Sequence, residues 1–277
     1  MIVDAHVHVW AQDPARYPWQ PLLSHVPVPT YPAPVEDLLA EMDAAGVDRA
    51  VLVQPSVYGW DNSYLCDCLA RWPDRFAGIG LVDPRGRDPA GDLARWRERG
   101  CQGVRLNLIR QGDPAWLAEA GCDAFWRAVE ALGQAVSFHM DLEQAGTVAA
   151  LARRHPAVPF LVDYLGPSVH RGGDPGPWLD RLAGEANVGF KLLSAGEDSR
   201  QPYPFPDLMP FYAEVFRRFG PHRMVFGSDF PGVRFACRYA EAMAWPARLP
   251  FLSEADRRTI LKETPARYWR FGQLSDK

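Results

Sequence analysis

Two histidines near the start of the chain, His6 and His8, are the residues whose type and spacing most directly indicate chemistry. The surrounding stretch, residues 2–9, is rich in β-branched and apolar side chains and is typical of a buried strand. Side chains two positions apart on a strand share one face, so both imidazoles project together. Two neutral imidazoles can bind a metal ion or donate to a substrate oxyanion. The alternative is a chance His-x-His on a solvated edge strand.

Other polar side chains occupy comparable positions further along the chain. Arg105, His139 and Asp229 each lie at or just after the end of an apolar, β-branched run. Residues of these types can bind a carboxylate, a metal ion or a reacting proton. Whether they act together depends on the elements that carry them.

Strand-like and helix-like patterns alternate along the chain. The predicted strands are Ile2–Val9, Ala50–Gln54, Gly78–Val82, Gly103–Leu108, Val136–Met140, Phe160–Tyr164, Gly189–Leu193 and Met224–Gly227. The predicted helices include Pro34–Ala45, Ser63–Trp72, Asp88–Arg99, Asp123–Leu132, Leu142–His155, Gly176–Ala183 and Leu208–Phe219. This order predicts an α/β fold, a single (β/α)8 TIM barrel forming one domain over residues 1–277. A doubly wound sheet is the alternative, but no Gly-x-Gly-x-x-Gly follows the first strand.

A closed parallel barrel would gather the polar residues at one mouth, where barrel active sites lie. The first and eighth strands become neighbours, which places Asp229 beside His6 and His8, with His139 across the mouth. The predicted metal ligands for one divalent ion, Zn²⁺ by preference, are His6, His8, His139 and Asp229. Because ligands must be deprotonated, occupancy is expected to fall below about pH 6.

Composition and charge argue against several classes of function. The net charge of −4 comes without a basic stripe, which argues against a nucleic-acid partner. No apolar run approaches the length of a membrane span, and Asp4 interrupts a first segment that does not resemble a signal peptide. The sequence predicts a cytoplasmic enzyme acting on a small molecule. A homo-oligomer stays one option for its assembly.

Seven ordered motifs run nearly end to end. They are Asp-Ala-His-Val-His-Val-Trp (4–10), Val-Gln-Pro-Ser (53–56) with Tyr-Gly-Trp-Asp-Asn (58–62), Leu-Val-Asp-Pro (81–84), Gly-Val-Arg-Leu-Asn (103–107), Lys-Leu-Leu-Ser (191–194), Phe-Gly-Ser-Asp-Phe-Pro (226–231) and Glu-Thr-Pro-Ala-Arg-Tyr-Trp (263–269). In this order they resemble the amidohydrolase superfamily, within it the lactonases typified by 2-pyrone-4,6-dicarboxylate lactonase and related sugar and muconolactone lactonases. That resemblance implies a barrel hydrolase whose metal dependence is weak or absent.

The chain departs from the family pattern at two strand ends. The superfamily commonly has His at the end of the sixth strand, where this chain has Tyr164. A tyrosine can donate a hydrogen bond there but cannot act as a base near neutral pH. Conversely, the dicarboxylate lactonase pattern lacks the fifth-strand His139. That branch also uses several Arg to hold two carboxylates, whereas this chain keeps Arg105 and offers Arg110.

Hydrolysis of a small lactone by water attack is the predicted reaction. Asp229 is the expected general base. His6 and His8 polarise the carbonyl, either directly or through one bound divalent ion, and Tyr164 adds a hydrogen bond. The residues expected to hold the substrate's carboxylate or hydroxyls are Arg105, Ser56, Tyr58 and Asn62.

Two other functions stay open. One is zinc-dependent decarboxylation of a small aromatic or muconate-type acid, which the four-ligand set favours and the missing sixth-strand His disfavours. The other is a catalytically silent binding barrel, with Tyr164 as the mark of lost activity. Arg105 also has a structural alternative, an ion pair with Asp83 or Asp141.

Overall fold

The computed structural model describes residues 1–277 apart from 25, 165–173, 194–195, 197–198 and 273–277. Its centre is an eight-stranded parallel sheet whose strands follow one another in sequence order. The strands are β1 (Val3–Val7), β2 (Arg49–Val53), β3 (Phe76–Leu81), β4 (Cys101–Asn107), β5 (Ala135–His139), β6 (Phe160–Tyr164), β7 (Val188–Leu193) and β8 (Met224–Gly227). The predicted TIM barrel is confirmed.

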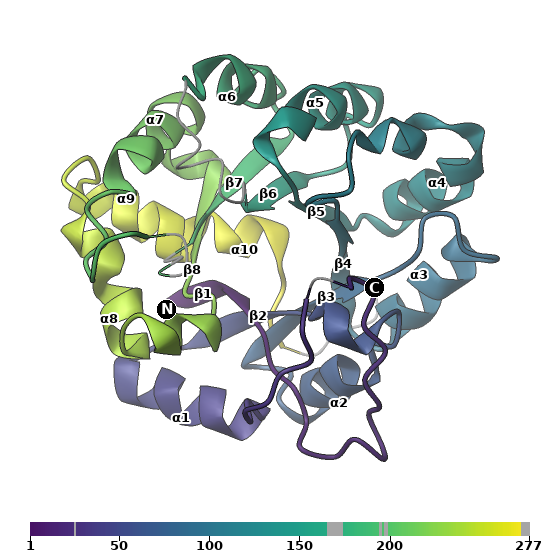
Figure 1. Ribbon diagram of the computed structural model, residues 1–277, viewed down its shortest axis with the longest axis horizontal. Coiled ribbons are helices and arrows are strands. Elements are labelled where there is room, and N and C mark those ends of the chain that lie inside the picture. Colours follow the sequence, from purple (N-terminus) through teal and green to yellow (C-terminus); the bar gives the residue numbers. More distant parts are fainter. Residues whose placement is uncertain (25, 165–173, 194–195, 197–198, 273–277) are drawn as a thin grey trace.

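Helices surround this ring of strands (Figure 1). They are α1 (Val35–Ala45), α2 (Ser63–Arg71), α3 (Pro89–Glu98), α4 (Asp123–Leu132), α5 (Ala145–Arg154), α6 (Gly176–Ala183), α7 (Met209–Phe219), α8 (Tyr239–Ala244), α9 (Glu254–Arg258) and α10 (Pro265–Tyr268). Local signals set several ends: Asp88 caps α3 by accepting from the Gly91 amide at 2.9 Å, and α4 ends at Gly133 with φ 59°. Within the described chain, no helix combines the length and apolar character needed to cross a membrane.

The barrel closes between β1 and β8. The Asp229 amide donates to the His6 carbonyl at 3.0 Å, and the His8 amide donates to the Phe230 carbonyl at 2.6 Å. Gly227 permits this close approach, because a Cβ there would lie 2.5 Å from the Cβ of His6. Closure therefore brings Asp229 next to both histidines.

A register irregularity in β1 separates the roles of Asp4 and His6. Strict alternation would put both side chains on one face. Instead, the buried Asp4 carboxylate accepts from the Ser228 amide at 2.9 Å and from the Tyr239 hydroxyl at 3.0 Å. Burial raises the pKa of Asp4 to about 6. Asp4 thus anchors the end of β8, one residue before Asp229.

One layer of the barrel interior is apolar. Val3, Val51, Ile79 and Leu161 from four strands form one buried cluster with Trp269. Trp269 directly follows α10, which crosses one end of the barrel (Figure 1). The polar side chains of the candidate site, described next, lie instead at the carboxyl ends of the strands.

Candidate active site

A cavity of about 470 Å³ lies at the carboxyl ends of the strands. His6, His8, Arg105, His139 and Asp229 all line it, so these five predicted site residues face one space. Most of the remaining wall is apolar, and half of its residues are residue 23 and residues 26–31. The volume is in the range of small-molecule sites, ~300–1,000 Å³.

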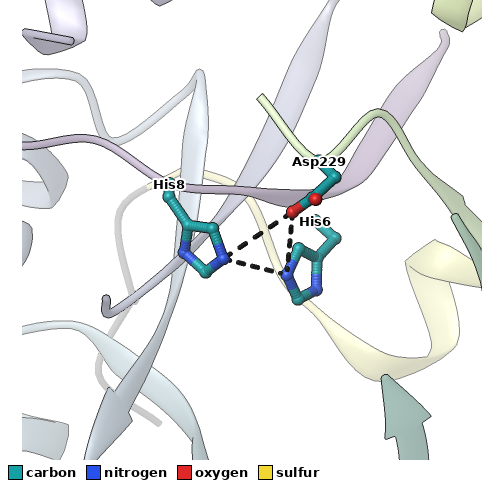
Figure 2. A group of neighbouring side chains, drawn as sticks. All are labelled: His6, His8 and Asp229. Atoms are coloured by element: carbon teal, nitrogen blue, oxygen red, sulfur yellow. Dashed lines mark hydrogen bonds and ion pairs between the residues drawn. The ribbon is translucent and has the colours of Figure 1, made fainter. Parts of the chain in front are cut away.

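His6, His8 and Asp229 form a compact group in this cavity (Figure 2). The two Nε2 atoms lie 3.2 Å apart. Asp229 Oδ1 lies 3.7 Å from His6 Nε2 and 3.8 Å from His8 Nε2. Asp229 also has a φ of 61°, in the left-handed region that Asp and Asn tolerate better than most residues. Backbone outliers of this kind cluster at functional sites.

Burial keeps both imidazoles neutral. Desolvation, reinforced by the Arg105 charge, lowers the pKa of His8 to about 3, although the bond to the Val53 carbonyl opposes the shift. Desolvation and the Lys191 charge hold the pKa of His6 well below its ordinary value. Neutral imidazoles are the form that binds metals and that donates without carrying charge.

The hydrogen bond to Val53 defines the tautomer of His8. His8 Nδ1 lies 2.7 Å from the Val53 carbonyl oxygen, which can only accept. Nδ1 therefore carries the ring hydrogen, and Nε2 presents its lone pair toward His6 and Asp229.

This group has the composition of a metal site. One ligand atom each from His6, His8 and Asp229 falls within 4.8 Å of the others. Two imidazole nitrogens and one carboxylate oxygen suit Zn²⁺. The donor set therefore fits a divalent ion.

His139 stands apart from the group, although the sequence predicted it as a fourth ligand. It lines the same cavity, but the cluster of ligand atoms within 4.8 Å does not include it. Its Nδ1 lies 3.2 Å from Asn107 Oδ1. His139 lies outside the group because its strand, β5, faces β1 across the barrel mouth rather than adjoining it.

Arg105 forms a buried ion pair, and its partner is Asp163 rather than Asp83 or Asp141. Arg105 Nε lies 2.9 Å from Asp163 Oδ2, since β4 and β6 both direct these side chains into the barrel. Lys191 Nζ lies 2.7 Å from Asp163 Oδ1. Lys191 was one of the polar strand-end residues in the sequence but had no specific predicted role; a lysine in the apolar run Phe-Lys-Leu-Leu (190–193) was a usable signal for one.

The three residues predicted from the second-strand loop have different positions. Ser56 lines the cavity. The Tyr58 hydroxyl accepts from the Ala11 amide at 2.8 Å, and the buried Asn62 side chain bonds both the amide and the carbonyl of Leu81, at 2.8 and 2.9 Å. Neither is among the described residues that line the cavity. Their partners make Tyr58 and Asn62 parts of the scaffold, because buried polar groups need such bonds.

Tyr164 is the last residue of β6, and its backbone is in register with His139. Its side chain lies outside the described part of the structure. The catalytic role predicted for Tyr164 therefore stays a prediction.

The chain belongs to the amidohydrolase family, whose model matches residues 3–271. It is 28% identical over 253 residues to an L-fucono-1,5-lactonase of Burkholderia ambifaria, covering 88% of this chain and 85% of the relative. It is also 28% identical over 286 residues to a 4-sulfomuconolactone hydrolase of Hydrogenophaga intermedia, covering 98% and 89%. The molecule is thus a hydrolase of the amidohydrolase superfamily.

Solved structures share the fold. A probable 2-pyrone-4,6-dicarboxylic acid hydrolase from Acinetobacter baumannii, with citric acid bound, has a TM-score of 0.82 at 22% identity, covering 96% of this chain and 98% of that one. An amidohydrolase from Burkholderia multivorans with bound zinc has a TM-score of 0.76 at 24% identity, with coverages of 96% and 98%.

Proposed function

We propose that the protein hydrolyses a small lactone by attack of water on the carbonyl carbon. The observation that carries the proposal is one carboxylate beside two neutral imidazoles in a single cavity. Lactone hydrolysis needs a base for the water and a group that stabilises the oxyanion, and this group has both. Two relatives named for lactone hydrolysis support the proposal.

Asp229 is the general base in this proposal. Its side chain is 18% exposed, so water in the cavity can reach it while the protein still surrounds it. The carboxylate accepts a proton from water as the water oxygen bonds to the carbonyl carbon. It then returns that proton to the ring oxygen as the carbon–oxygen bond breaks, which leaves a hydroxy acid.

One divalent ion, with zinc as the best match, would be held by His6, His8 and Asp229. When bound, such an ion supplies Lewis-acid polarisation of the carbonyl. A metal-free site would polarise the carbonyl with an imidazole N–H instead. The donor set and the zinc-bound structure of similar fold support the metal form.

The cavity walls favour a compact substrate with one anionic group. Asp163 pairs with Nε of Arg105, so the terminal nitrogens of Arg105 are the groups suited to a substrate carboxylate. Ser56 adds a hydroxyl. Apolar neighbours such as Trp10 and Leu193 offer no partners to a ring rich in hydroxyls, which favours a muconolactone-like ring over a sugar lactone.

The position of His139 weakens the decarboxylase alternative. The decarboxylase alternative required three imidazoles and a carboxylate around one ion. The group formed by His6, His8 and Asp229 contains two imidazoles. The lactonase proposal needs no fourth ligand.

A lactone panel tests the proposal. Sugar 1,4- and 1,5-lactones, muconolactones and simple alkyl lactones are followed by acid release, using chelator-treated and zinc-loaded protein. We expect ring opening to be fastest with a carboxylated muconolactone. Turnover of aromatic acids without any lactone turnover would favour the decarboxylase, and no turnover in either set would favour a silent barrel.

Metal retention at acid pH is a second expected result. Protons begin to compete with a metal ion for an ordinary imidazole near the imidazole pKa of about 6.5. Because burial lowers the pKa of His8 to about 3, protons compete for this ligand only far below pH 6. The burial of His8 therefore predicts zinc loss at a lower pH than the sequence alone predicts. Zinc content after dialysis should be equal at pH 7 and pH 5, with circular dichroism confirming the fold. Half-loss near pH 6 would contradict a strongly lowered pKa of His8.

Tyr164→Phe tests the predicted sixth-strand donor. Tyrosine at pH 7 is protonated, so it can act on an oxyanion only by donating a hydrogen bond. Removing one such donor costs roughly 10²–10³ in rate. We expect a kcat lowered to that extent with KM little changed, measured by steady-state kinetics. An unchanged kcat would remove Tyr164 from the catalytic set.

A further inference from the structure

Arg105, Asp163 and Lys191 are three charged side chains buried in contact with one another, and Arg105 also lines the cavity. Asp163 is paired with Arg105, yet Lys191 also contacts the same carboxylate. The side chains of Asp163 and Lys191 are 0% exposed, and Lys191 Nζ lies above the Trp269 ring at 5.8 Å from its centroid. One carboxylate thus faces two cations in a largely apolar interior. Burying a second cation beside one carboxylate is costly.

The second contact of Lys191 points to its purpose. Lys191 Nζ lies 3.4 Å from His6 Nδ1. Burial lowers the pKa of Lys191, and the 2.7 Å ion pair with Asp163 opposes that shift and favours the ammonium form. An ammonium can donate hydrogen bonds but cannot accept them. His6 Nδ1 must therefore accept, and the hydrogen of the neutral ring must lie on Nε2.

The contact of His6 with His8, at the other nitrogen of the His6 ring, agrees with placing the His6 hydrogen on Nε2. His6 Nε2 lies 3.2 Å from His8 Nε2. His8 carries its hydrogen on Nδ1, which donates to Val53, so its Nε2 accepts. The hydrogen bonds thus run in one direction, from Lys191 through His6 and His8 to the Val53 carbonyl.

We propose that Lys191 is a positioning residue that fixes the Nε2–H tautomer of His6, so that the metal-free site presents a ring N–H beside Asp229. A metal ion at His6 Nε2 needs that nitrogen's lone pair. The hydrogen must then move to Nδ1, where it meets the ammonium of Lys191, a second donor. Lys191 therefore opposes metal binding at His6 while it maintains the metal-free donor.

Replacing Lys191 should change the tautomer. Lys191→Met keeps the chain length and removes the donor. His6 Nδ1 can then carry the hydrogen, which the negative charge of Asp163 Oδ2, 4.0 Å away, favours electrostatically. We expect His6 to shift to the Nδ1–H form and zinc to bind about tenfold tighter. Simple structural damage would loosen zinc binding instead.

The experiment uses metal-free full-length protein with ¹⁵N-labelled histidine. Ring ¹⁵N shifts report the tautomer, and His6→Gln and His8→Gln spectra assign the two signals among the seven histidines. Zinc affinity is measured by chelator competition. Lys262→Met is the matched control, because Lys262 is exposed. Neither readout needs a substrate, so the result is independent of the lactonase proposal.

The expected result is Nε2–H at His6 and Nδ1–H at His8 in the wild type, with only His6 changing in Lys191→Met. Should Lys191→Met fail to fold, the wild-type spectrum still decides. A wild-type His6 in the Nδ1–H form would overturn the proposal. Unchanged His6 shifts and unchanged zinc affinity in a folded Lys191→Met protein would overturn it as well.

Discussion

Asp229→Asn should abolish lactone turnover while leaving the fold intact. The amide keeps the shape of the carboxylate but cannot accept the proton of the attacking water. Asn also tolerates the left-handed backbone at this position, where φ is 61°. The substitution therefore removes the proton acceptor without adding backbone strain. General-base catalysis contributes ~10²–10⁴-fold, and kcat should fall to that extent.

The control for this experiment is Asp43→Asn on α1, whose carboxylate is 65% exposed. It should match the wild type in kcat and in thermal unfolding. Asp229→Asn with more than about a tenth of the wild-type kcat would exclude a general-base role, given the usual size of that effect.

Arg105→Lys should weaken substrate binding more than it slows the chemical step. A lysine keeps one positive charge near Asp163 but cannot pair with that carboxylate through one nitrogen and present two further nitrogens to the cavity. Losing a charge-assisted hydrogen bond costs ~1.5–3 kcal/mol. We therefore expect KM for a carboxylated lactone to rise about 10- to 100-fold with a smaller change in kcat.

A neutral lactone of the same ring size distinguishes a loss of carboxylate binding from general damage to the protein in Arg105→Lys. Its KM should respond little to Arg105→Lys, because it has no carboxylate for the guanidinium. Arg217→Lys, at an exposed position of α7, is the matched control. Equal losses for charged and neutral lactones would mean that Arg105 supports the fold rather than the substrate.

The central group of the site could be predicted from sequence because each signal was local. His-x-His on a β-branched run indicated paired imidazoles, and the alternation of strands and helices indicated a barrel that brings Asp229 to them. Both steps depend on short-range patterns and one topological rule. The confirmed strand order and the 3.7 Å separation of His6 Nε2 from Asp229 Oδ1 agree with that reasoning.

Pairings across the barrel could not be predicted in the same way. Which carboxylate meets Arg105 depends on side-chain reach and register across the interior, and the answer was Asp163. The contact between Lys191 and His6 could not be predicted for the same reason, because these residues are 185 positions apart in sequence and meet only inside the barrel. The separation of His139 from the group formed by His6, His8 and Asp229 likewise depends on barrel geometry rather than on any local pattern.

Hydrolysis in ¹⁸O-water tests the central claim most directly. The wild-type protein opens a lactone in labelled water, and mass spectrometry locates the new oxygen. Water attack at the carbonyl predicts one ¹⁸O in the new carboxylate and none in the released hydroxyl, with Asp229→Asn giving only the background rate. Label in the hydroxyl, or no ring opening of any lactone above background, would contradict the proposed reaction.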